Sequence, residues 1–520
     1  MSTVIEATTA VRAGNARDVV KGDNCVLVIF GASGDLAKRK LIPALFDMAC
    51  AGCMAPKFAV LGLGRNEMTT DEFRKTMREG AAASKEIHTF NSEGWNEFEK
   101  RLIYKACDTG DPAMYTALAA TLDEMHKAGA SQNTIYYLST PASIAPQIIG
   151  GLGAAGLARR EGGVWTRIVV EKPFGRDLET AEALNQELLQ VFREKEIYRI
   201  DHYLGKETVQ NLLVFRFGNS MFEPIWNRNY IDYVEITGVE TLGVGNRTGF
   251  YEETGALRDM VANHMLQLLT LTAMEPPVAF EADAVREQKV QVLRSIHPMT
   301  LEEVAQRTVR GQYGPGTIDG QHVPGYREEP GVDKNSPRET FVAVEFRIDN
   351  WRWAGVPFYV RTGKRMALPL TQIDVHLKRT PQALFARSAT DLVEPQDLSI
   401  RIQPHEGIAM TFSAKVPGAH MRTATVRMDF AYKNAFGGST SPAYETLLLD
   451  AMRGDATLFT RRDEVEAEWK LITPIEDAWE QLPPPHFPNY PAGSGGPIAQ
   501  EALVHKNGHE WRDLTQETES

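Results

Sequence analysis

The nine residues Arg199–Glu207 read RIDHYLGKE, a dense run of charged and aromatic side chains. Asp201 is followed at once by His202 and Tyr203, and Lys206 lies three positions further on. A phosphate dianion binds where several charged or strong hydrogen-bond donors converge. The segment therefore favours a binding site for a small anionic molecule.

A second candidate for chemistry is His264, in the segment Gly255–Met274. Apolar residues recur there at helical spacing, which predicts one long helix. A histidine on an apolar stripe is more often a core residue than a catalyst, but Asp259 and Asn263 are polar neighbours at the same end of the helix. From these residues alone, both interpretations stay open.

A glycine-rich turn follows the first apolar run. Cys25–Phe30 is unbroken and apolar, as expected of a buried parallel strand, and it leads directly into GASGDLAK. The pattern is G-x-x-G-x-x-A rather than the usual G-x-G-x-x-G, and a plain strand-to-helix turn is the alternative. Backbone N–H groups at such a turn can approach a pyrophosphate. The candidate coenzyme contacts are Gly31, Ser33, Gly34, Asp35 and Leu36.

The residue after the second predicted strand bears on the type of coenzyme. This strand, Phe58–Arg65, ends in an arginine. NAD-binding domains usually carry an acid at this place, whereas an arginine suits the 2′-phosphate of NADP. Arg65 therefore favours NADP, with NAD as a possible coenzyme and a solvated arginine as the structural alternative.

Further predicted strands alternate with helices, which is typical of a Rossmann-type parallel sheet. Two of them lead directly into polar segments, EKPFG (Glu171–Gly175) and RIDHYLGKE. Ligands bind beyond the carboxyl ends of such strands, so we expect both segments at the carboxyl edge of one sheet. The strands are Thr134–Leu138, Arg167–Val170 and Ile197–Ile200.

From about residue 209 the pattern changes to alternating strands without intervening helices, which predicts an α+β domain with a mainly antiparallel sheet. We expect a flexible tail over 1–22, an NADP-binding Rossmann-type domain over 23–204, and a substrate-binding and oligomerisation domain over 205–520. The predicted strands are Asp232–Val239, Glu339–Ile348, Phe358–Arg361, Leu398–Gln403, Gly407–Val416 and Thr423–Tyr432.

Composition excludes several classes of protein. A chain of 520 residues exceeds one ordinary core, so two domains are expected. The net charge of −12 argues against a nucleic-acid partner. No apolar run has the length of a membrane span and the first 22 residues do not resemble a signal peptide, so we expect a cytoplasmic protein with no membrane association. Four cysteines make no disulfide framework, and no metal site is expected.

Six segments together resemble one family. GASGDLAKRK, EKPFG, RIDHYLGKE, NRNYIDYVEITGVET, GALRDMVANHMLQL and WAGVPFYVRTGK occur in the order found in glucose-6-phosphate dehydrogenases, across roughly Val26–Arg461. The resemblance implies oxidation of glucose 6-phosphate at its anomeric carbon to the 6-phosphogluconolactone, with hydride transfer to NADP. This is the first step of the oxidative pentose phosphate pathway. It also implies a homodimer or homotetramer formed through the large sheet.

The resemblance also implies roles for single residues. His264 would be the general base and Asp201 its carboxylate partner, because a neutral histidine with a pKa near 6.5 can take a hydroxyl proton. No metal is needed for this reaction. The substrate site would comprise His202, Tyr203 and Lys206 for the phosphate, Glu240 and Asp259 for sugar hydroxyls, Lys364 for the substrate, and Lys172 between coenzyme and substrate.

One stretch departs from the family pattern. Relatives often carry a second basic residue several positions after the lysine that corresponds to Lys364, and Met366–Leu370 offers none. Either Arg365 substitutes for it or the phosphate is held with one positive charge fewer.

Two other functions are compatible with parts of this sequence. A sugar oxidoreductase of the glucose–fructose oxidoreductase type would pair similar domains, but it would normally show G-x-G-x-x-G after the first strand. A non-enzymatic NADP-binding regulator would bind the dinucleotide without turnover, and it would need neither an acid–base pair nor a phosphate cluster.

Overall fold

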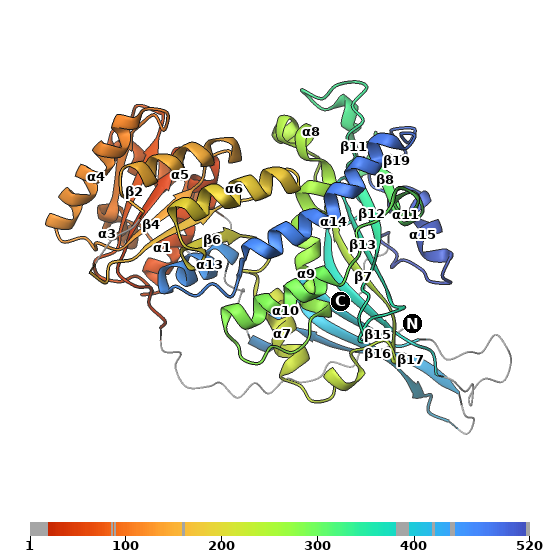
Figure 1. The fold of residues 1–520 in the computed structure, drawn as a ribbon. Helices are drawn as coiled ribbons and strands as arrows, with labels where there is room; N and C mark the ends of the chain where they lie inside the picture. The colour runs from red at the N-terminus through yellow and green to blue at the C-terminus, as the bar shows by residue number, and fades with distance from the viewer. Residues whose placement is uncertain are drawn as a thin grey trace.

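The structure is a computed structural model that describes residues 19–84, 87, 90–158, 162–380, 395–418, 422–436 and 442–515. It consists of two bodies, each built around one large sheet, with the helix α14 (Arg462–Gln481) running between them (Figure 1). Residues 1–18 of the tail predicted over 1–22 lie outside the described residues.

The first body contains a seven-stranded sheet in the order β18-β6-β5-β4-β1-β2-β3. Strands β1 to β6 are parallel, and the short β18 pairs antiparallel with β6. The predicted Rossmann-type sheet is confirmed. Sequence analysis missed β3, a half-exposed edge strand. The strands are β1 Val26–Phe30, β2 Ala59–Gly64, β3 Leu102–Ala106, β4 Thr134–Leu138, β5 Thr166–Val170, β6 Ile197–Ile200 and β18 Phe459–Thr460.

Helices cover this sheet (Figure 1). After the glycine turn the chain forms one π-helical turn, η1 (Ala37–Leu41), and then α1 (Ile42–Cys50), whose first turn holds the buried Pro43. A proline in the first turn loses no intrahelical hydrogen bond. The other elements are α2 Thr70–Ala83, α3 Ser92–Phe98, η2 Glu99–Arg101, α4 Pro112–Lys127, η3 Ala142–Ile144, α5 Ala145–Ala154, α6 Leu178–Val191 and η4 Glu194–Glu196.

The second body contains an eight-stranded sheet in the order β17-β16-β15-β14-β7-β13-β12-β8. Neighbouring strands are antiparallel except β7 and β13, which are parallel, so the predicted mainly antiparallel sheet is confirmed. Its strands are β7 Ile231–Val239, β8 Thr308–Gly311, β12 Phe341–Arg347, β13 Pro357–Gly363, β14 Leu370–Leu377, β15 Asp397–Gln403, β16 Gly407–Lys415 and β17 Thr423–Ala431. Short pairs are β9 Tyr313–Gly314 with β19 Tyr490–Pro491, and β10 Gly316–Ile318 with β11 Gln321–Val323.

This half contains more helices than the single one that the sequence pattern predicted. The prediction was wrong here although a local signal exists, since apolar residues recur at helical spacing in several of these segments, as Val465, Trp469, Ile472 and Trp479 do in α14. The helices are α7 Glu207–Phe217, η5 Glu223–Ile225, η6 Gly245–Arg247, α8 Thr248–Ala256, η7 Leu257–Met265, α9 Leu266–Ala273, α10 Ala282–Arg294, α11 Leu301–Arg307, η8 Tyr326–Glu328, α12 Tyr432–Phe436, α13 Ala443–Arg453, α14 and α15 Ala499–His505.

The helix predicted over Gly255–Met274 is present, but it is not a regular α-helix. A kink at Gly255 (φ +63°, ψ −173°) breaks the last turn of α8, directly before the π-helical η7, which continues into α9. Glu339 holds the start of η7, because its backbone oxygen accepts from the N–H of Ala256 and its carboxylate from the N–H of Leu257, both at 3.2 Å. The kink and its buried carboxylate therefore fix the direction of the segment that carries His264.

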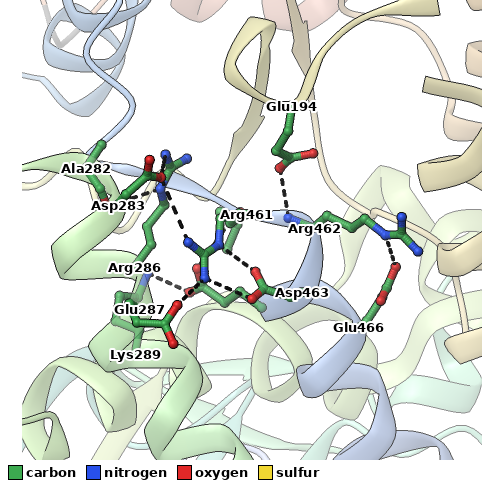
Figure 2. Close-up of polar contacts among 12 residues, drawn as sticks. Glu194, Ala282, Asp283, Arg286, Glu287, Lys289, Arg461, Arg462, Asp463 and Glu466 are labelled. Carbon is green, nitrogen blue, oxygen red and sulfur yellow. Dashed lines mark hydrogen bonds and ion pairs between the residues drawn. The ribbon is translucent and has the colours of Figure 1, made fainter. Parts of the chain in front are cut away.

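The start of α14 is tied to both bodies (Figure 2). The guanidinium of Arg461 contacts Asp463 and, on α10, Glu287, each at 2.7 Å. The backbone N–H of Arg462 donates to Glu194, which precedes β6, at 2.9 Å. The helix then contacts α6 of the first body and η7 of the second. It therefore fixes the carboxyl end of β6 relative to η7.

The predicted division at residues 204 and 205 stays a prediction, since β18 and α14 lie far beyond it in sequence and still pack on the first body. Within the described ranges, no helix has both the length and the apolar character that crossing a bilayer requires.

Replacing the glycine at the kink should destabilise the protein. The backbone of Gly255 lies in a region that is almost restricted to glycine, and an added Cβ would meet the Glu339 carboxylate at 2.0 Å. We expect Gly255→Ala to lower the free energy of unfolding by about 1–3 kcal/mol, measured by denaturant unfolding. Gly249→Ala on α8 is the matched control, because its Cβ would meet nothing within 4 Å. Equal stability of the two variants would contradict this account.

Candidate active site

A buried carboxylate–histidine pair lies where the two bodies meet. Asp201 follows β6 directly, and η7 brings His264 to it, so that Oδ1 of Asp201 lies 2.6 Å from Nδ1 of His264. The side chains are 5% and 1% exposed. The backbone N–H of Tyr203 donates to the same Oδ1 at 2.9 Å, which fixes the carboxylate.

Lys172, two residues beyond β5, faces the other nitrogen of the imidazole. Its Nζ lies 2.7 Å from Nε2 of His264, and it also donates to the backbone oxygen of Asp259 at 2.9 Å and to its carboxylate at 3.3 Å. An ammonium group only donates, so these contacts assign the proton of His264 to Nδ1 and the lone pair to Nε2.

The charges of the pair follow from its surroundings. Burial lowers the pKa of His264 below its usual value, against the raising effect of the Asp201 carboxylate, and the ammonium of Lys172 lowers it further. Burial opposes ionisation of Asp201, but its contacts with His264 and the nearby positive charges hold the pKa of that carboxyl well below its usual range. A neutral imidazole beside an ionised carboxylate is the arrangement of a general base.

The RIDHYLGKE side chains surround this pair. The Tyr203 ring stacks on the His264 ring with centroids 4.1 Å apart, and the His202 ring lies 4.5 Å from it. Nζ of Lys206 lies 4.3 Å from the centre of the Tyr203 ring and donates to Gln403. Burial lowers the pKa of Lys206 to about 8, although nearby carboxylates such as Glu406 oppose this.

Acidic and basic side chains from the second sheet complete the cluster. Lys364, just after β13, forms an ion pair with Glu240, just after β7, at 2.8 Å. The Glu240 side chain is 41% exposed, so its carboxylate is open to a ligand. Burial opposes ionisation of Asp259, but Lys172 and Lys364 lower its pKa to about 2. Both carboxylates can therefore accept hydrogen bonds from hydroxyl groups.

The glycine turn has the geometry of a dinucleotide cradle. Gly31 has φ +83°, and a Cβ there would lie 2.4 Å from the backbone oxygen of Ser139. The turn follows β1, where the strand order reverses between β4 and β2, the usual dinucleotide position in such sheets. A nicotinamide dinucleotide therefore fits this turn.

The other predicted coenzyme contacts lie around this turn. Ser33 hydrogen-bonds Tyr104, Asp35 pairs with Arg39 at 2.8 Å on the surface, and Leu36 is half-buried. Arg65 is exposed directly after β2. Lys40, on η1, is near enough to lower the pKa of Lys206, so the turn and the polar cluster share one region. The individual roles of these residues stay predictions.

Several residues near the pair were missed by sequence analysis. Glu171 is half-buried and accepts hydrogen bonds from the hydroxyl groups of Tyr137 and, at 3.2 Å, Tyr444. Tyr444 in turn lies parallel to the His202 ring. The motif EKPFG was a signal for Glu171, whereas Tyr444 and Gln403 carry no local signal.

Arg365 does not join the polar cluster. Its guanidinium lies 3.9 Å from the carboxylate of Glu329, and its backbone has φ +56°. This placement favours the second alternative from sequence analysis, a phosphate site with one positive charge fewer.

Asp201, His202 and His264 place their ligand atoms within 4.8 Å of one another, an arrangement that could also hold a metal ion. Nδ1 of His264 is already bonded to Asp201, so acid–base chemistry uses these groups as they stand. The absence of a functional metal stays a prediction.

Comparisons with known proteins agree with this geometry. Residues 28–211 match the family model described as glucose-6-phosphate dehydrogenase, NAD binding domain, and residues 213–512 match its C-terminal domain. Glucose-6-phosphate 1-dehydrogenase of Aggregatibacter actinomycetemcomitans is 48% identical over 95% of this chain and 98% of its own length, and that of Chlamydia pneumoniae is 46% identical over 94% and 96%.

Solved structures are similar over the same length. A glucose-6-phosphate dehydrogenase in complex with its substrate glucose 6-phosphate has a TM-score of 0.85 and 33% identity, covering 96% of this chain and all of that one. A glucose-6-phosphate 1-dehydrogenase from Mycobacterium avium has a TM-score of 0.78 and 35% identity, covering 94% and 99%.

The buried histidine should make stability depend on pH. Because the folded-state pKa of His264 lies below its usual value of about 6.5, the unfolded chain takes up a proton on acidification that the folded protein does not. Its contribution to the free energy of unfolding is therefore lost as pH falls from 7 to 5, by up to about 1.4 kcal/mol per unit. Denaturant unfolding of His264→Gln should show a smaller slope with pH. The exposed His322 on β11 supplies the control His322→Gln, and an equal reduction in both would contradict the assignment.

Proposed function

This chain belongs to the glucose-6-phosphate dehydrogenase family, and we propose that it oxidises glucose 6-phosphate at its anomeric carbon. The observation that carries the proposal is the buried pair of Asp201 and His264, with Nε2 of the histidine directed into a cluster of Lys172, Tyr203 and Asp259. It supplies the base that removal of a hydroxyl proton requires.

The protein's part in this reaction is to hold the sugar and take the proton. When bound, the nicotinamide coenzyme supplies the hydride acceptor. The anomeric hydroxyl replaces Lys172 as the partner of Nε2, and its proton passes to that nitrogen as the carbonyl bond of the lactone forms. The carboxylate of Asp201, 2.6 Å from Nδ1, then stabilises the imidazolium. Lys172 stays beside the oxygen as a donor.

One part of the polar cluster would bind the phosphate of the substrate, and the other part would bind its sugar hydroxyls. The positive charge of Lys206, with donors from His202 and Tyr203, suits the phosphate. Glu240 and Asp259 are acceptors for the sugar hydroxyls, and Lys364 holds Glu240 in place at 2.8 Å.

For the coenzyme we propose NADP rather than NAD. The turn of Gly31, Ser33 and Gly34 would hold the pyrophosphate, with Asp35 and Leu36 beside it. The exposed guanidinium of Arg65 would meet the 2′-phosphate.

We propose a homodimer or homotetramer formed through the large sheet. Strands β16 and β17 are only half-buried in the single chain, and Met428 on β17 is 51% exposed, so this sheet has apolar surface to cover. All four cysteines are free, in keeping with the expected cytoplasmic location.

The two alternative functions are not favoured. The family models together cover residues 28–211 and 213–512, and the relatives named above match over nearly their whole length. A regulator without turnover has no need of the buried base.

Removing the base should abolish turnover without loss of coenzyme binding. We expect His264→Ala to lower kcat by about 10²–10⁴-fold, the usual contribution of general base catalysis. In the wild type, kcat/KM should fall on the acid side with an apparent pKa below 6.5, because the base must be neutral. Steady-state kinetics measures both, and titration of NADP is the binding control. Unchanged turnover in His264→Ala would remove this residue from the mechanism.

The reaction and the coenzyme preference can be tested in one assay. We expect glucose 6-phosphate to reduce NADP faster than NAD, followed by absorbance of the reduced nicotinamide. Arg65→Ala should raise the KM for NADP about tenfold, as expected for loss of one charge-assisted hydrogen bond, and leave that for NAD unchanged. Arg193→Ala is the control, since Arg193 precedes β6 and lies at the opposite end of the sheet. Absence of reduction with either coenzyme would contradict the proposed function.

A further inference from the structure

A small, partly open cavity lies against the carboxylate of Asp201. Its volume is about 20 Å³, enough for one buried water. Arg199 and Asp201, at the end of β6, form one side of its lining, and Gln267 of α9 and Glu468 of α14 also line it. The cavity thus lies where α14 joins the two bodies.

Three of these four residues carry a buried polar atom that has no hydrogen-bond partner in the described part of the chain. They are Nε of Arg199, Oδ2 of Asp201 and Oε1 of Gln267. Their remaining polar atoms are well satisfied, since the two terminal nitrogens of Arg199 donate to Glu194 (2.6 Å) and Asn185 (2.8 Å). Buried polar groups in native proteins are almost always paired, so three unpaired atoms around one cavity indicate a shared partner.

Glu468 supplies a fourth group at the same cavity. Its Oε1 accepts from Nε2 of Gln267 at 2.6 Å, and that nitrogen also donates to Glu464 at 2.9 Å. Glu464 forms a fully buried ion pair with Lys289 of α10 at 2.6 Å, so the ammonium group of that lysine is already paired with another carboxylate than Glu468.

The protonation of Glu468 follows from these neighbours. Burial raises the pKa of Glu468 well above its usual value, and the charges of Glu464 and Asp201 raise it further against the opposing effect of Lys289. Glu171 and Lys172 are the other charged groups on the cavity wall. This raised pKa favours the protonated carboxyl group of Glu468, which has an O–H group to donate.

We propose that one ordered water occupies this cavity and that Glu468 is a positioning residue that acts through it on Asp201. A water molecule has two protons to donate and two lone pairs. It would donate to Oδ2 of Asp201 and Oε1 of Gln267, and it would accept from Nε of Arg199 and from the carboxyl group of Glu468. The four groups present two acceptors and two donors, so the water satisfies all of them.

This water gives the second oxygen of Asp201 a defined partner. Oδ1 already accepts from His264 and Tyr203, and a bond at Oδ2 would prevent rotation of the carboxylate away from the imidazole. A hydrogen bond to the charged form also moderates the basicity of Asp201. The role of Glu468 in turnover rests on the proposed function of His264, whereas the water site does not.

Two variants of Glu468 separate hydrogen bonding from packing. Glu468→Gln keeps a donor toward the water and an acceptor for Gln267, so kcat should stay within about twofold of the wild type. Glu468→Leu removes the donor. We expect it to lower kcat about tenfold, the effect of one hydrogen bond to a charged group. In this variant the apparent pKa of the acid limb, below which kcat/KM falls, should rise by about half a pH unit to one pH unit. The reason is that a less stabilised Asp201 carboxylate holds the proton on His264 more strongly.

Ile472→Ala is the control for disturbed packing, since this fully buried residue of α14 does not line the cavity. It should lower stability without moving the acid limb. An unshifted limb and unchanged kcat in Glu468→Leu would overturn the proposal, as would a Glu468→Gln enzyme as impaired as Glu468→Leu.

A crystal structure of the wild-type protein tests the site independently of activity. We expect density for one water within hydrogen-bond distance of Asp201 Oδ2, Arg199 Nε and Gln267 Oε1. No water at this position would overturn the proposal even if the enzyme turns over. A bound water in a protein that does not oxidise glucose 6-phosphate would uphold the site and reject the proposed function instead.

Discussion

The hydrogen bond between Asp201 and His264 is the contact on which the candidate site depends. It joins a residue just beyond a parallel strand of one body to a π-helical turn of the other, and both groups are almost completely buried. A buried carboxylate is costly unless it is well hydrogen-bonded. That requirement therefore fixes the end of β6 and the helix η7 in their relative positions. A small shift of either part would leave a charge without its partner.

The surrounding elements serve this one contact from several directions. The kink at Gly255, held by Glu339, directs η7 toward β6, and α14 spans the two bodies with its start tied to Glu194 and α10. Parallel strands bring Lys172 and Asp201 to the same edge of the first sheet. The site residues Lys172, Asp201, Glu240 and Lys364 therefore lie within the first two residues after rigid strands, which limits their movement as a defined geometry requires.

Local patterns predicted the parts of this site that depend on local physics. The apolar run before Gly31 gave β1 and its turn, and the polar segments at Glu171 and Asp201 do lie at one sheet edge. The pairing of Asp201 with His264 spans 63 residues and came only from family resemblance. Strand β14 was missed although Ile373, Val375 and Leu377 alternate with polar residues. The π-helical form of η7 and the position of Glu468 depend on tertiary contacts, so no local period could predict them.

The antiparallel pairing of β18 with β6 has a consequence for biosynthesis. Residues 459–460 complete the sheet edge at Arg199 and Ile200, immediately before Asp201. Synthesis must therefore pass residue 460 before the dinucleotide-binding body is whole, although the first strand of that body begins at Val26. The first body therefore cannot complete its sheet edge from its own contiguous segment, and a chain that stops before residue 459 would leave β6 unpaired on that side.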